Sequence, residues 1–114
     1  MTPEEFGNVI REAYTSCPNV IPASWSYIDY AHYKDFVKCC AVGVVAYTLG
    51  SKSCWTNYDI DIAKPIIDRY GVTAENLNDV SDGFENVSGK DAKDVNWWKI
   101  GQDIRKEFLD VSWS

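Results

Sequence analysis

Apolar residues recur every three or four positions near the start of the chain. This spacing is typical of a helix that buries one face, and it is carried by Phe6, Val9, Ile10, Ala13, Tyr14 and Cys17. Thr2 stands before the pattern, with a proline next and an acid three residues later, which is the signature of an N-cap with a capping box. The first seventeen residues therefore predict a helix that begins after Thr2.

The next two segments have no single period. Residues 18–33 contain two prolines and four aromatic residues, so they predict a packed connection, although the alternation of Trp25 and Tyr27 leaves a short strand open. Residues 35–49 are apolar on nearly every side, which predicts a buried central helix with Gly50 as its C-terminal cap. The valines of this run also suit a buried strand, but its length favours the helix. Gly43 would let a neighbouring helix approach closely.

Three further helices are predicted in the second half of the chain. One begins near Asp59 or Asp61 and ends at Gly71, where Pro65 is tolerated in the first turn. The next is capped by Thr73 and extends through Phe84, and the last covers 94–108, with 87–91 as a loop between them. With no internal repeat, the expected fold class is all-α: residues 1–114 form a single-domain orthogonal bundle of about five helices.

Composition and charge narrow the classes of function. The chain is 46% apolar and 25% charged, the balance of an ordinary globular protein, and its net charge is -6. A negative protein repels nucleic acid and anionic lipid, so neither is expected as a direct partner. No apolar run approaches the length of about 18 residues that a spanning helix needs, and the acidic amino terminus does not resemble a secretory signal. The expected location is the reducing cytoplasm, with the four cysteines as free thiols.

The acids are concentrated in one part of the chain. Residues 59–94 contain nine acids and four bases, a balance of -5 out of the total of -6. In the helix after Thr73, acids recur at spacings of four, three and three, which predicts one acidic stripe made of Glu75, Asp79, Asp82 and Glu85. A solvated face that keeps the protein soluble is one interpretation. The other is a docking surface for a basic patch on a partner protein, because such complementarity steers association.

Aromatic residues supply a second candidate surface. Five Trp and seven Tyr are too many for the interior of 114 residues, and Trp and Tyr are favoured anchors of interfaces. Trp25 and Trp55 are therefore predicted to join the four acids in a binding site, and a homodimer formed through exposed aromatics is a further option. Together these features predict a non-enzymatic adaptor, regulator or inhibitor that binds a basic partner.

The alternative is a small helical enzyme or ligand-binding protein with a pocket lined by aromatic and cysteine side chains. Cys54, in a loop, and His32, the single imidazole, would lie at the mouth of that pocket. Neither the cysteines nor the acids have the spacing of a known metal site, and no motif indicates a cofactor, so none is expected. A helix-turn-helix DNA binder is disfavoured because acids share the helix that would hold its bases, Lys93, Lys99, Arg105 and Lys106.

Overall fold

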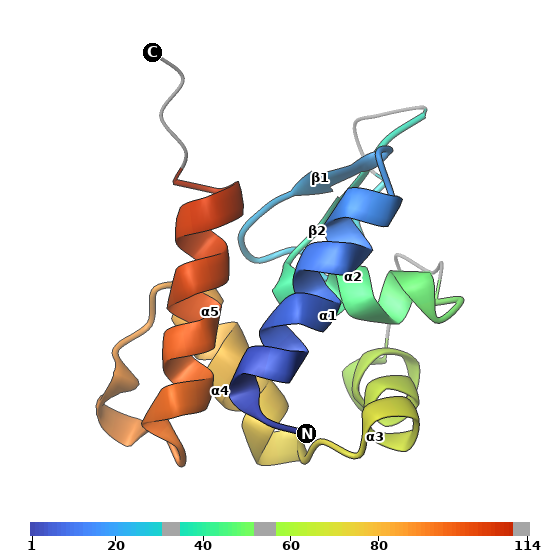
Figure 1. Ribbon diagram of the computed structural model, residues 1–114. Coiled ribbons are helices and arrows are strands. Elements are labelled where there is room, and N and C mark those ends of the chain that lie inside the picture. Colours follow the sequence, from blue (N-terminus) through green and yellow to red (C-terminus); the bar gives the residue numbers. More distant parts are fainter. Residues whose placement is uncertain (31–34, 52–56, 111–114) are drawn as a thin grey trace.

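Helices make up most of the fold (Figure 1). The computed structural model describes residues 1–30, 35–51 and 57–110. Over these ranges it contains five α-helices: α1 Pro3–Ser16, α2 Ala41–Thr48, α3 Lys64–Tyr70, α4 Ala74–Phe84 and α5 Val95–Phe108. A π-helical segment, η1 Tyr58–Ala63, leads into α3, and a 3₁₀ turn, η2 Gly89–Asp91, precedes α5. The radius of gyration is 13.0 Å, close to the value of about 13 Å expected for one compact body of this length.

The predicted helix ends are confirmed where capping residues mark them. The Thr2 hydroxyl accepts from the Glu5 N–H at 3.1 Å, and the Glu5 carboxylate accepts from the Thr2 N–H at 2.8 Å. Thr73 and Asn76 form the same reciprocal pair at the start of α4, and the Asp94 carboxylate accepts from the Asn96 N–H at the start of α5. Such caps satisfy backbone donors that the helix itself cannot pair.

Two short strands correct the prediction of a purely helical fold. β1 Val20–Pro22 pairs in parallel with β2 Val37–Cys39, with Val20 opposite Val37. The predicted central helix over 35–49 is therefore wrong over residues 35–40, and α2 begins only at Ala41. A fully apolar run has no period that separates buried strand from buried helix, and its partner strand lies seventeen residues away in the register. The mainly helical character of the chain is confirmed.

Cys40 and Gly43 determine how the start of α2 packs against the segment that precedes β2. The Cys40 thiol caps α2, since it accepts from the Gly43 N–H at 3.4 Å. A Cβ atom on Gly43 would overlap the backbone of Tyr27, coming within 2.8 Å of the Tyr27 Cα. The close neighbour of Gly43 is thus the irregular segment before β2, and the prediction that it is a helix is wrong. This contact presses the Trp25–Tyr27 segment against the start of α2.

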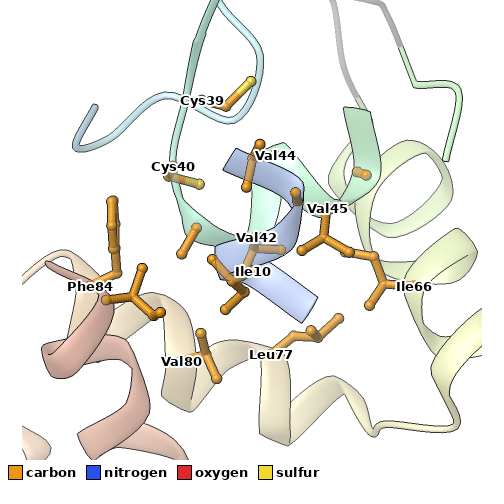
Figure 2. Packing of buried hydrophobic residues seen from close by; sticks show 14 of the residues in the cluster. Ile10, Cys39, Cys40, Val42, Val44, Val45, Ile66, Leu77, Val80 and Phe84 are labelled. Carbon is orange, nitrogen blue, oxygen red and sulfur yellow. The ribbon is translucent and has the colours of Figure 1, made fainter. Parts of the chain in front are cut away.

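The core is formed by apolar side chains from all five helices and both strands. Figure 2 shows side chains of α1, α2, α3 and α4 converging on one interior, among them Ile10, Val42, Ile66 and Leu77, all fully buried. α4 and α5 lie side by side (Figure 1) and make the most extensive contact between elements. None of the described helices combines the length and the apolar character required to cross a bilayer.

Candidate functional site

One face of α4 and the segment before β2 enclose a cavity of about 210 Å³. α4 and its C-cap residue contribute side chains that are spaced by three, one and three residues and so share one face of the helix: Asn78, Ser81, Asp82 and Glu85. The opposite wall is formed by Trp25, Ser26, Tyr27 and Cys40. We call this space the Trp25 cavity. It brings together three of the six residues that the sequence predicted as a binding site.

Trp25 lies at the rim of the cavity and is held by Glu85. Its backbone N–H donates to the Glu85 Oε2 at 2.6 Å, and its φ is 61°, a left-handed conformation that is uncommon for a tryptophan. The side chain is 75% exposed, the largest fraction among the exposed large apolar residues of the described chain. The bond to Glu85 therefore fixes the backbone of Trp25 while its indole faces solvent.

Tyr27 is supported from the other side by η1. Its ring packs against the ring of Tyr58, with centroids 5.0 Å apart and planes inclined by 40°. Burial raises the pKa of the Tyr58 hydroxyl to about 12, so Tyr58 is neutral at physiological pH. The aromatic wall is thus built on a packed pair and not on a single exposed ring.

Arg105 of α5 ties both walls of the cavity together. Its Nη1 donates to the Phe84 carbonyl at 2.7 Å and to the Ser24 hydroxyl at 3.2 Å, and its Nε donates to Asp110. Phe84 and Ser24 directly precede Glu85 and Trp25 in the chain. An arginine that the helix-turn-helix interpretation needed as an exposed base is therefore used inside the fold.

The predicted acidic stripe of α4 divides between two edges of the helix. Asp79 is only 3% exposed, and its carboxylate accepts from the backbone N–H groups of Lys93 at 3.1 Å and of Asp94 at 2.8 Å. Asp79 and Glu85 are six positions apart, so they project about 120° from each other at 100° per residue. The prediction that Asp79 belongs to an exposed stripe is wrong, because the segment that leads into α5 covers that edge.

The remaining predicted residues are placed as follows. Glu75 is exposed in the first turn of α4 and does not line the Trp25 cavity. Trp55 lies outside the described residues, as do His32 and Cys54 of the alternative interpretation. Of the predicted set, the structure thus brings Trp25, Asp82 and Glu85 to one place.

Desolvation acts on both carboxylates of the Trp25 cavity. It raises the pKa of Asp82, with a further increase from the negative charge of Asp79. It also raises the pKa of Glu85, against the opposing effects of the Trp25 N–H and of Arg105. Among the described residues, neither Asp82 nor Glu85 forms a salt bridge. The cavity therefore presents two carboxylates that no side chain of residues 1–30, 35–51 and 57–110 neutralises by direct pairing.

The thiol in the cavity wall is unsuited to nucleophilic chemistry. Cys40 is 2% exposed, and burial raises its pKa to about 12. It is therefore neutral near pH 7 and does not serve as the reactive cysteine of the enzymatic alternative. In residues 1–30, 35–51 and 57–110, no three His, Cys, Asp or Glu side chains gather closely enough to hold a metal ion.

A second cavity, of about 420 Å³, lies between α1, the end of α2 and α3. Its lining includes one acid, Glu12, and one base, Arg69, over apolar side chains of Val9 and Leu49. The Arg69 guanidinium lies 5.3 Å from the centre of the Tyr70 ring, a cation–π contact. None of the residues that the sequence predicted as a binding site lines this cavity, and its formal charges cancel.

The six predicted site residues left out five that line the cavity: Ser26, Tyr27, Cys40, Asn78 and Ser81. The helical spacing of Asn78 and Ser81 with Asp82 and Glu85 could have grouped them, whereas the approach of Trp25 and Tyr27 depends on the tertiary fold. Comparison with protein-family models, curated proteins and solved structures finds no match for the chain.

Proposed function

We propose that this chain is a small protein-binding module, an adaptor, regulator or inhibitor, that docks a basic surface of a partner protein at the Trp25 cavity. One observation carries the proposal: two carboxylates that form no ion pair with a described residue share a cavity with a tryptophan that is 75% exposed. Exposed aromatic anchors next to charge are typical of protein interfaces. The thiols of Cys17 and Cys40 form no disulfide bond with a described residue, which supports a reducing, cytoplasmic location for the module.

Asp82 is exposed and Glu85 is partly buried, and both line the same partly enclosed space, which favours a cationic partner. A positive group that enters the cavity is attracted by Asp82 and Glu85 with less screening than on an open surface. It also offsets the desolvation that raises the pKa of both carboxylates. The same cation would bind only weakly to solvated acids elsewhere on the surface, since exposed ion pairs contribute only about 0–1 kcal/mol.

A fluorescent peptide rich in Arg, Lys and Gly, used as a model of a basic surface, tests this proposal by anisotropy. The double variant Asp82→Asn/Glu85→Gln should bind it about tenfold more weakly than the parent, a loss of about 1.4 kcal/mol. A matched control, Glu75→Gln/Asp103→Asn, removes the same charge from exposed positions outside the cavity and should change affinity less than about twofold. Gln at position 85 keeps an oxygen that can accept from the Trp25 N–H.

The same affinity is also measured as a function of ionic strength and of pH. Affinity should fall as ionic strength rises, because screening weakens the attraction. Affinity should also fall as the pH is lowered, because protonation removes the charge of Asp82 and Glu85. The raised pKa of both groups places this loss at a higher pH than for a carboxylate with an ordinary pKa. Equal losses in the two double variants would mean that the acids form only a solvated face.

A second candidate function, a small-molecule binding protein, is favoured by the aromatic and cysteine side chains in the cavity wall. The cavity of about 210 Å³ is smaller than the range of about 300–1,000 Å³ that is usual for ligand pockets. A small organic cation is the ligand that its charge would suit. Binding of such a cation without any affinity for the basic peptide would select this candidate.

A further inference from the structure

We propose that the group received by the Trp25 cavity is an arginine side chain of the partner. This inference rests on the proposed function and specifies the chemistry of the bound group. The size of the cavity sets the first limit. Its volume of about 210 Å³ equals that of about seven water molecules at about 30 Å³ each, which suits one side chain and not a nucleotide or other cofactor.

In the part of the chain that the structure describes, no basic side chain forms an ion pair with Asp82 or Glu85. The Arg105 guanidinium is near enough to lower the pKa of Glu85, but its hydrogen bonds go to Phe84, Ser24 and Asp110. The Oε2 of Glu85 is occupied by the Trp25 N–H, whereas no described residue donates to its Oε1 or to the carboxylate of Asp82. Acceptors for an incoming donor are therefore present on both acids.

The arrangement of these acceptors favours a guanidinium over an ammonium group. Asp82 and Glu85 project about 60° apart on α4, and the Ser81 hydroxyl lies on the same face. A guanidinium carries five N–H donors in one plane, so a single group can reach several acceptors that lie in different directions. An ammonium group concentrates its charge at one point and is more strongly hydrated.

The exposed indole supplies a surface on which a planar cation can stack. Arginine stacks on aromatic faces more readily than lysine, and tryptophan is the best aromatic partner for a cation. The Trp25 backbone is held by Glu85, and the Tyr27 ring is held by Tyr58, so the backbone of the first residue and the ring of the second are in place before binding. Such preorganisation lowers the entropic cost of recognition.

Three blocked pentapeptides, Gly-Gly-Xaa-Gly-Gly with Arg, Lys or citrulline in the centre, test the inference by NMR on ¹⁵N-labelled protein. The arginine peptide should shift the Trp25 indole resonance saturably, with a dissociation constant in the millimolar range. The lysine peptide should bind at least about fivefold more weakly, and citrulline, which is planar but neutral, should cause no saturable shift. Asp82→Asn and Trp25→Asn should each weaken arginine binding at least about threefold, whereas Glu75→Gln should not. In all three variants binding is followed by the backbone amide shifts of residues 78–86, because Trp25→Asn removes the indole resonance.

The variants are chosen so that folding does not obscure the result. Asp82 makes no hydrogen bond to a described residue, and asparagine tolerates the left-handed conformation of position 25. Equal affinity for lysine and arginine, or arginine binding that survives both Asp82→Asn and Trp25→Asn, overturns the arginine inference. If the arginine inference fails but the basic peptide of the anisotropy experiment binds, the proposed docking of a basic partner is retained. If neither probe binds, both proposals fail.

Discussion

Replacing Gly83 with alanine should lower the free energy of unfolding by about 3 kcal/mol or more, because α4 and α5 meet there at backbone contact. A Cβ on Gly83 would overlap the carbonyl oxygen of Trp98 and come within 3.0 Å of the Gln102 N. The reciprocal glycine, Gly101, faces the Val80 carbonyl and the Phe84 N, the latter at 2.7 Å. Backbone atoms cannot rotate away, so the two helices would have to separate.

Urea denaturation followed by circular dichroism measures this loss. Gly7→Ala is the matched control, a buried glycine in α1 whose added Cβ would meet only side-chain atoms of Arg11 and Ile100, both at 3.3 Å. Those atoms can shift, so this change should stay within about 1 kcal/mol of the parent. A Gly83→Ala protein as stable as Gly7→Ala would show that the two helices are not packed this closely.

Replacing Asp79 with alanine should cost about 3 kcal/mol of folding stability. Each carboxylate oxygen accepts one backbone N–H, from Lys93 or Asp94, at the entrance to α5. Hydrogen bonds to a charged group contribute about 1.5–3 kcal/mol each, and alanine would leave both donors without their partner. Asn at position 79 should lose less, because its oxygen still accepts one of the two bonds.

Asp82→Ala is the control for this prediction, since Asp82 is on the same helix but is exposed and makes no hydrogen bond to a described residue. Its effect should stay within about 0.5 kcal/mol. The urea concentrations at the unfolding midpoints of the two variants measure this difference in stability. Equal stability of Asp79→Ala and Asp82→Ala would contradict the assignment of Asp79 as the internal support of α5.

Much of the helical framework can be predicted from local chemistry. Thr2, Thr73 and Asp94 mark helix starts, and Gly71, with a φ of 70°, ends α3 as predicted. Each of these signals acts within a few residues, so one sequence is sufficient to recognise it. The strand Val37–Cys39 could not be separated from α2 in the same way, because its identity depends on pairing with Val20–Pro22.

The candidate site was predictable only in part for a related reason. Spacing places Asp79, Asp82 and Glu85 on one side of a helix, but it does not say which edge a neighbouring element will cover. The segment that enters α5 covers Asp79, whereas Trp25 reaches Glu85 from sixty residues away in the chain. Tertiary packing therefore gives the predicted stripe two roles: Asp79 supports the start of α5, and Asp82 and Glu85 line the Trp25 cavity.

Chemical-shift mapping with the Arg, Lys and Gly peptide tests most directly whether the Trp25 cavity is the docking site. Backbone resonances of residues 24–27 and 78–86 should move together and saturably as the peptide is added to ¹⁵N-labelled protein, and the Trp25 indole should follow the same curve. Shifts of similar size at the exposed acids of α1 and α3, Glu4, Glu12 and Asp68, with none at the cavity, would contradict the proposed docking site.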